Sequence, residues 1–212
     1  MSYQMNNYLS AAADFFSERF TNHGPVPTGV DWGSEDAQDI RLKSLLKIIS
    51  SGDQDFSIAD VGCGYGRLLS LLESTNYLSY TGYEIADVFL DFARNKFISN
   101  RRVSFEKNSN FMDIKEHDYV FLSGLFNKKF GLLDSEFEQY ILESINLLSK
   151  KSKRGLAINF LSSYSDVDKR REDLYYSNPL VLFDYIKLNI TPNVAINHDY
   201  GLWDFNVFMR FD

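Results

Sequence analysis

Three glycines stand at alternate positions where a strand-like run meets a helix-like run. In the segment IADVGCGYGRLL, residues 58–69, they are Gly62, Gly64 and Gly66. Glycine permits a tight strand-to-helix turn and lets a ligand lie against bare backbone. A dinucleotide fingerprint needs its third glycine one position later, where this chain has Arg67. The GxGxG spacing therefore argues against NAD or FAD and against a dehydrogenase.

Two carboxylates flank this turn. Glu84 ends the next strand-like run, 18 positions after Gly66 (66 to 84), and Asp60 precedes the first glycine. In a βαβ crossover the end of the second strand lies beside the first turn, so Glu84 can accept both hydroxyls of a ribose. Asp60 can face a cationic amino group. A cofactor with a sulfonium, an ammonium and no phosphate suits this pair of carboxylates.

Strand-like and helix-like segments alternate around the turn, which predicts a parallel sheet covered by helices on both faces. The helical segments have apolar residues at spacings of three and four. The expected strands cover residues 57–61, 78–84, 103–107, 118–123 and 155–161, and the expected helices cover residues 36–50, 66–74, 86–99 and 135–149.

The pattern changes after the fifth strand. We expect a helix over residues 179–188 and strands over 194–198 and 203–211, joined by a short turn at Gly201 that suits an antiparallel hairpin. The predicted fold class is α/β, a Rossmann-like doubly wound sheet of seven strands, mostly parallel, with a C-terminal antiparallel hairpin. Residues 36–212 form its single domain. Residues 1–35, with a helix over 9–19 and a turn-rich stretch over 23–33, can fold over the binding crevice as a lid.

The turn, the acidic end of YTGYE and the sheet order resemble the class I, S-adenosylmethionine-dependent methyltransferases. This resemblance covers most of the chain from Gly29 onward. Other segments resemble a group of small bacterial methyltransferases often found among surface-polysaccharide genes. These segments are GVDWGSEDAQ, DYVFLSGLFN, NFLSSYSD, LYYSNP and NHDYGLWDF. The resemblance implies S-adenosyl-L-methionine as the cofactor and a sugar or another small polar molecule as the methyl acceptor.

Ligands of open parallel sheets bind beyond the carboxyl ends of the strands. The fourth strand ends in SGLFN, so Ser123 and Gly124 should lie near the transferred methyl group. Asp113, after the third strand, is a candidate for the adenine amino group, and a surface turn is nearly as good an interpretation. Trp32 can close over the cofactor or simply anchor its segment. The predicted cofactor-binding set is Asp60, Gly62, Cys63, Gly64, Gly66, Glu84, Ile85, Asp113, Ser123, Gly124 and Trp32.

A hydroxyl acceptor benefits from a general base, and histidine titrates near neutral pH. His23 lies in the lid and His198 near the hairpin, whereas His117 precedes the fourth strand and is expected to be solvated, away from the crevice. Asp199 could orient His198, but neighbours along a strand point to opposite faces, so a structural hydrogen bond at the hairpin is the favoured alternative. The catalytic candidates are His198, His23 and Tyr164. The substrate-binding candidates are Phe126, Asn127, Tyr164, Asp166, Tyr175 and Tyr176, of which Phe126 can equally be core and Asp166 a helix cap.

Composition limits the partners and the compartment. The formal net charge of -7 and a pI near 5.0 disfavour nucleic acid, because phosphate backbones attract clustered basic residues. The amino terminus lacks the pattern of a secretory signal, and no apolar run is long enough to span a bilayer. Cys63 is the only cysteine, and no His, Cys or carboxylate cluster has metal-ligand spacing. We therefore predict a cytoplasmic protein without a metal or membrane partner.

The sequence predicts transfer of a methyl group from S-adenosyl-L-methionine to a small-molecule acceptor, and the family resemblance implies an oxygen of a saccharide, nucleotide sugar or related metabolite as that acceptor. Two alternatives stay open. One is methylation of protein or RNA, which would need an extended groove or a basic stripe. The other is a non-catalytic partner protein that keeps the cofactor site. The oligomeric state cannot be predicted from these patterns.

Overall fold

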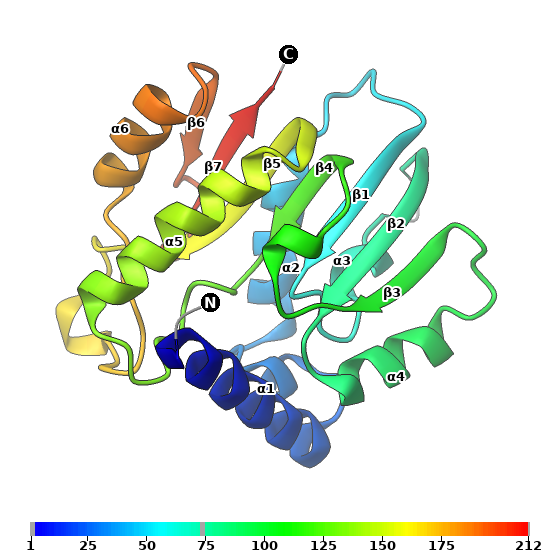
Figure 1. The fold of residues 1–212 in the computed structure, drawn as a ribbon, viewed down its shortest axis with the longest axis horizontal. Helices are drawn as coiled ribbons and strands as arrows, with labels where there is room; N and C mark the ends of the chain where they lie inside the picture. The colour runs from blue at the N-terminus through cyan, green and yellow to red at the C-terminus, as the bar shows by residue number, and fades with distance from the viewer. Residues whose placement is uncertain (1–2, 73–74, 212) are drawn as a thin grey trace.

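A seven-stranded sheet forms the centre of the molecule (Figure 1), and the computed structural model describes residues 3–72 and 75–211. The strand order is β3-β2-β1-β4-β5-β7-β6. All neighbours from β3 to β5 pair in parallel, and β7 is antiparallel to both β5 and β6. This confirms the predicted doubly wound sheet with its C-terminal hairpin. The strands are β1 Phe56–Val61, β2 Tyr77–Glu84, β3 Val103–Lys107, β4 His117–Leu122, β5 Ser152–Leu161, β6 Val194–Asn197 and β7 Asp204–Arg210.

Helices cover both faces of the sheet, as the alternating pattern predicts (Figure 1). Short 3-10 helices lie at Pro27–Val30, Leu46–Ile48, Phe111–Asp113 and Val167–Lys169. Among the described residues, no helix has both the length and the hydropathy required to cross a membrane. The α-helices are α1 Tyr3–His23, α2 Glu35–Leu45, α3 Arg67–Ser70, α4 Asp87–Lys96, α5 Asp134–Ser149 and α6 Pro179–Asn189.

Two helices differ most from the predicted bounds. The segment expected to be helical over 66–74 forms α3 only over Arg67–Ser70, because the N–H groups of Leu71 and Leu72 bond three residues back in a tight turn. Residues 73 and 74 of that prediction lie outside the described residues. The helix predicted over 9–19 is longer and ends at His23. The Gly24 N–H still bonds to Phe20 O at 2.7 Å, and the φ of 77° at Gly24 then turns the chain out of the helix.

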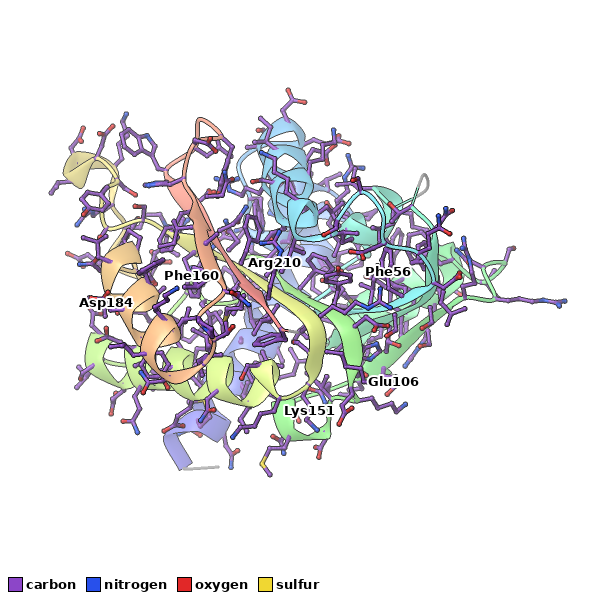
Figure 2. All side chains as sticks on the ribbon, turned by 90° about the horizontal axis from the view of Figure 1, so that it is seen from above. Phe56, Glu106, Lys151, Phe160, Asp184 and Arg210 are labelled. Atoms are coloured by element: carbon purple, nitrogen blue, oxygen red, sulfur yellow. The ribbon has the colours of Figure 1, made fainter. Side chains whose placement is uncertain are left out.

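The central strands are buried on both faces, so neighbouring residues belong to different clusters of the core. In β1, Ile58 packs with α2, α3 and α4, and Ala59 packs with α5 and α6. Phe56 and Phe160, labelled in Figure 2, belong to these two clusters and are fully buried. The sheet is therefore a rigid platform whose strand ends can hold a site in place.

Helix α1 crosses the edge at which β1, β2 and β3 end (Figure 1). Its Phe20 ring packs 4.5 Å from the Phe89 ring of α4, measured between ring centroids. At its other end, Tyr8 is buried against Phe130 and Phe137. The N-terminal segment thus lies over the carboxyl ends of the strands, where the crevice was expected.

Candidate cofactor site

A cleft opens at the carboxyl ends of β1, β2 and β4, beneath α1 and the segment that follows it. Most of the predicted cofactor-binding residues line it together. They are Asp60, Gly62, Cys63, Gly64, Glu84, Ile85, Ser123, Gly124 and Trp32. The topology explains this convergence, because β1 lies between β2 and β4 in the sheet and their ends share one edge.

The Gly-rich turn needs glycine for two different reasons. Gly62 and Gly64 have φ values of 74° and 52°, and both line the cleft with bare backbone. Gly66 does not line the cleft. A Cβ on Gly66 would lie 2.7 Å from Cε2 of Phe97, so this glycine allows the turn to pack against the end of α4.

Glu84 is held in place by backbone donors. Its Oε2 accepts the Gly64 N–H at 2.9 Å, and its Oε1 accepts the N–H groups of Ile85 and Ala86 at 2.7 and 3.1 Å. Burial raises the pKa of the Glu84 carboxyl, and these three hydrogen bonds act in the opposite direction. The side chain is therefore a fixed acceptor at the wall of the cleft, one strand away from the turn.

Asp60 is 4% exposed and lies at the end of β1, where it lines the same cleft. The Tyr80 hydroxyl donates to its Oδ2 at 2.6 Å. Burial and, to a smaller extent, the charge of Glu84 raise the pKa of Asp60 to about 7, against the lowering effect of that hydrogen bond. A buried carboxyl of this kind ionises more readily when a cation is placed beside it.

The raised pKa of Asp60 predicts a pH-dependent stability. The carboxyl of Asp60 has a pKa of about 7 in the folded state and of 3.8 in the unfolded chain, so the folded state holds the proton more tightly. The free energy of unfolding therefore falls as the pH rises from about 4 to about 7. We expect Asp60→Asn to raise the melting temperature of the ligand-free protein at pH 8. The advantage should shrink as the pH falls and vanish near pH 4. Melting curves across this range test it, and a constant difference at every pH would contradict it.

The end of β4 supplies the wall opposite Glu84. Gly124 has a φ of 75°, and a Cβ there would lie 2.8 Å from Cζ2 of Trp32. The indole therefore rests directly on the glycine backbone. The buried Ser123 Oγ has no hydrogen-bond partner among the described residues, and Ser123 lines the cleft. An unpaired hydroxyl in this position is available to a ligand.

The loop after β3 lines the cleft, but with residues other than the predicted Asp113. Asp113 is exposed and does not line the cleft, which agrees with the surface-turn alternative. Instead, Asn108, Ser109 and Phe111 line it. The Asn108 N–H donates to Glu84 O at 2.9 Å, so this loop follows the end of β2 and then turns away. Strand β3 ends at Lys107, and the contact with the cleft is made by residues that follow directly, before the chain reaches Asp113.

The N-terminal segment contributes a wall that the sequence did not predict in detail. Tyr8, Ala12 and Phe16 line the cleft from one face of α1, and Val30 lines it from the segment that follows. Their four-residue spacing is the signal that could have identified this face, because residues at i and i+4 lie above one another on a helix. The lid prediction concerned position only, and the structure places this segment across the cleft.

An ion-pair network joins this segment to the loops beyond β4 and β5. The Asp31 carboxylate lies 3.5 Å from Arg19 Nη1, 3.6 Å from Lys128 Nζ and 3.4 Å from Arg171 Nη2. Asp173 pairs with both Lys128 and Arg171, and these bonds hold the pKa of Asp173 well below its usual range. Lys128 also lines the cleft. The network thus ties Lys128, at the cleft, to the N-terminal segment and to the loop after β5.

The predicted substrate-binding residues do not line this cleft. Phe126 is fully buried and stacks on Phe160, with ring centroids 5.8 Å apart, so the core alternative holds. Tyr175 packs against Phe137 in the same cluster, and the Tyr176 hydroxyl accepts the Arg171 N–H. Asn127 is partly buried, and its backbone oxygen accepts the Tyr175 N–H.

Asp166 does not cap the short helix that follows it, contrary to the cap alternative. No side-chain cap hydrogen bond forms there, and its carboxylate pairs instead with Lys169 at 2.9 Å. The aromatic ring of Tyr164 is 57% exposed at the turn after β5. These residues lie at the carboxyl end of β5, outside the cleft lining.

The histidines also lie away from the cleft lining. His23 is exposed at the end of α1. His198 is exposed between β6 and β7, where its ring packs near Tyr164 and Phe205, and Asp199 accepts a hydrogen bond from Asn197. The expectation that His117 is solvated was wrong. His117 begins β4, is 6% exposed and lies 3.1 Å from the Tyr83 hydroxyl through Nε2, and burial lowers its pKa.

The described residues contain no group of three or more His, Cys, Asp or Glu side chains arranged to hold a metal ion. The arrangement that remains is a cleft with a glycine turn, two buried carboxyls, an unpaired hydroxyl and aromatic walls. Such a cleft suits a ligand that combines a cation, a ribose and a flat ring.

No family model matches the chain. A protein of Mycobacterium tuberculosis named "Putative methyltransferase Rv1506c" is 37% identical over 166 residues, which covers 78% of this chain and 98% of the relative. Among solved structures, magnesium protoporphyrin IX methyltransferase from Synechocystis PCC 6803, with bound SAH, has a TM-score of 0.67 at 13% identity and covers 96% of this chain and 99% of its own. The N-methyltransferase NodS from Bradyrhizobium japonicum WM9 has a TM-score of 0.66 at 11% identity, and the match covers 95% of this chain and 98% of NodS.

Proposed function

The chain belongs to the class I, S-adenosylmethionine-dependent methyltransferases, and from this premise we propose that it methylates an oxygen of a small polar acceptor such as a saccharide or nucleotide sugar. The observation that carries the cofactor assignment is the single cleft in which the Gly-rich turn, Glu84 and Gly124 meet. The acceptor class rests on the resemblance of segments such as GVDWGSEDAQ and NHDYGLWDF to small bacterial methyltransferases.

The residues of the cleft fit S-adenosylmethionine. The bare backbone of Gly62 and Gly64 leaves room for the methionine part, and Asp60 can meet its ammonium group. Glu84 presents a fixed carboxylate for the ribose hydroxyls, and Ile85 and Phe111 offer apolar contacts to the adenine ring. Both carboxyls suit a ligand that carries positive charge and no phosphate.

When bound, S-adenosylmethionine supplies a methyl group that is already activated by a positively charged sulfur. The tasks left to the protein are to align the acceptor and to exclude water. Ser123 and Gly124 form the wall at the end of β4, and Trp32 covers it. We place the transferred methyl group at this wall. Residues 1–35 act in this proposal as the lid that closes the cleft.

A polar acceptor is supported by the surface beside the lid. Tyr164 and Trp203 are 57% and 52% exposed, and they lie at the end of β5 and the start of β7, on the same edge of the sheet as the turn. Ser162 N and Ser165 Oγ both donate to Trp203 O, which holds these two segments together. Exposed aromatic rings offer apolar faces with polar tips, which suits a sugar ring. The net charge of -7 disfavours RNA as the acceptor.

Calorimetry and a turnover assay test this function. We expect the protein to bind S-adenosylmethionine and S-adenosylhomocysteine with micromolar dissociation constants and not to bind NADH. Mixtures of nucleotide sugars and free saccharides, incubated with S-adenosylmethionine, should release S-adenosylhomocysteine. Turnover only with a protein or RNA preparation would overturn the acceptor class. Absence of cofactor binding would overturn the enzyme assignment.

A further inference from the structure

We propose that Arg41 is a positioning residue for Trp32, and that Asp204 holds Arg41 so that the indole covers the Gly124 wall of the cofactor cleft. This inference rests on the proposed function, because it concerns the same cleft. It adds Arg41 and Asp204, which belong neither to the cleft lining nor to the predicted site residues, and it links the C-terminal strand to the lid.

The first contact of this link is a stack between Arg41 and Trp32. Cζ of Arg41, on α2, lies 4.6 Å from the centroid of the Trp32 ring. The guanidinium is planar, so it can lie flat on an indole in a way that an ammonium group cannot. The indole also meets Gly124, where only a missing Cβ leaves room for it. Trp32 thus contacts both a cation and the backbone at the end of β4.

The second contact explains why Arg41 stays in place. Nε of Arg41 donates to Oδ2 of Asp204, whose side chain is fully buried, while the side chain of Arg41 is 17% exposed. The other carboxylate oxygen accepts bonds from the Tyr200 hydroxyl and from Nδ2 of Asn159. A buried carboxylate with these partners strongly favours a cation beside it. Asp204 therefore fixes the guanidinium on the Trp32 side.

The backbone around Trp32 does not fix its side chain in the same way. Trp32 follows the short 3-10 helix Pro27–Val30, and its N–H bonds to Pro27 O at 2.9 Å. The indole itself contacts Arg41 and the backbone of Gly124. Removing the guanidinium leaves the ring free to rotate away from the cleft, which would expose the bound cofactor to water. We expect cofactor affinity to fall while the sheet stays folded.

The test uses the two tryptophans of the chain, Trp32 and Trp203. In a Trp203→Phe background, Trp32 is the only tryptophan, so excitation selective for indole measures its access to acrylamide directly. We expect Arg41→Ala to raise the Stern–Volmer constant of Trp32 about twofold and to weaken binding of S-adenosylhomocysteine about tenfold, the scale of a lost cation–π contact. Arg41→Lys should give values of the Stern–Volmer constant and of the affinity between those of the wild type and Arg41→Ala, because the lysine side chain is a cation but cannot stack as a plane.

Two further variants complete the design. Asp204→Asn should increase the quenching of Trp32, as Arg41→Ala does. Both variants break a buried ion pair, so a melting curve must exclude misfolding in each of them. The matched control is Arg102→Ala, because Cζ of Arg102 lies 4.3 Å from the Tyr77 ring on β2, away from the cleft lining. That variant should leave both Trp32 quenching and cofactor affinity unchanged.

The outcomes separate this inference from the function on which it rests. Unchanged quenching and unchanged affinity in Arg41→Ala would overturn the positioning role, even if the wild type binds the cofactor well. Equal losses in Arg41→Ala and Arg102→Ala would also overturn it, since they would show a general loss of stability. A wild type that binds no S-adenosylhomocysteine would overturn the proposed function, whereas the quenching of Trp32 in the free protein would still report on the stack.

Discussion

Glu84→Ala is expected to weaken binding of S-adenosylhomocysteine by about a hundredfold or more. The variant removes the fixed carboxylate for two ribose hydroxyls, and each charge-assisted hydrogen bond contributes about 1.5–3 kcal/mol. It also removes the acceptor of the Gly64, Ile85 and Ala86 N–H groups, so the turn loses its brace. Both effects act on the same ligand. Isothermal titration of the wild type and the variant with S-adenosylhomocysteine measures the loss.

A matched control distinguishes this effect from a loss of surface charge. Glu106 lies on the neighbouring strand β3 and pairs with Lys115 at 2.7 Å, outside the cleft lining. Glu106→Ala should leave the affinity within about twofold, because exposed ion pairs contribute little. The affinity of Glu84→Gln for S-adenosylhomocysteine should lie between those of the wild type and Glu84→Ala, since the amide keeps an acceptor oxygen and loses the charge. Full affinity in Glu84→Ala would show that the ribose binds elsewhere.

The fold could be predicted from the sequence because its signals are local. The apolar run before Gly62 has to be a buried strand, and its positive-φ glycines demand a turn directly after it. The hairpin followed from Gly201 between two strand-like runs, and the structure confirms the antiparallel pairing of β6 with β7. Element ends were harder to predict: α3 ends at Ser70, where the N–H groups of Leu71 and Leu72 bond three residues back instead of four.

The cofactor side of the site could be predicted for the same reason. In this topology the turn after β1 lies beside the ends of β2 and β4, so Asp60, Glu84 and Gly124 had to converge. The place of Asp113 relative to the cleft could not be predicted in this way. A loop without a periodic pattern gives no register, and the structure shows that the residues directly after Lys107 reach the cleft first.

The acceptor side could not be predicted, since it depends on contacts between distant segments. Tyr175 looks like a pocket residue in sequence, yet it packs on Phe137 of α5. His117 looks like a solvated residue before a strand, yet the end of β2 supplies the Tyr83 hydroxyl as a partner. In both cases a polar or aromatic side chain was assigned by type, whereas its environment is decided by an element far away in the chain.

The N-terminal segment illustrates the same limit at larger scale. Its helix was expected, but the choice of Tyr8, Ala12 and Phe16 as the face toward the cleft depends on how α1 rests on α4 and on Phe130. Trp32 was expected to close over the cofactor or to anchor its segment. Its contacts with Arg41 and Gly124 fit an anchor, and its place in the cleft lining keeps the first interpretation as part of our proposal.

Phe126→Ala is expected to destabilise the protein by about 3–5 kcal/mol, the usual cost of truncating a buried phenylalanine. Phe126 is fully buried, stacks on Phe160 and meets Tyr140 edge-on at 5.9 Å. For a chain of this size the loss corresponds to a fall in melting temperature of roughly 10 °C. Phe126→Leu should cost less, because it keeps most of the apolar volume. Denaturant unfolding and calorimetric melting measure both values.

This prediction separates a core residue from an acceptor-binding one. If Phe126 acts through packing alone, both variants should bind S-adenosylhomocysteine with an affinity within about threefold of the wild type, at temperatures well below their melting temperatures. The reason is that Phe126 belongs to the core and not to the cleft lining, so the cavity left by its truncation does not open into the cofactor site. Tyr164→Ala is the control, because a 57% exposed ring should change the free energy of unfolding by less than about 0.5 kcal/mol. A stable Phe126→Ala protein that had lost turnover would return this residue to the acceptor site.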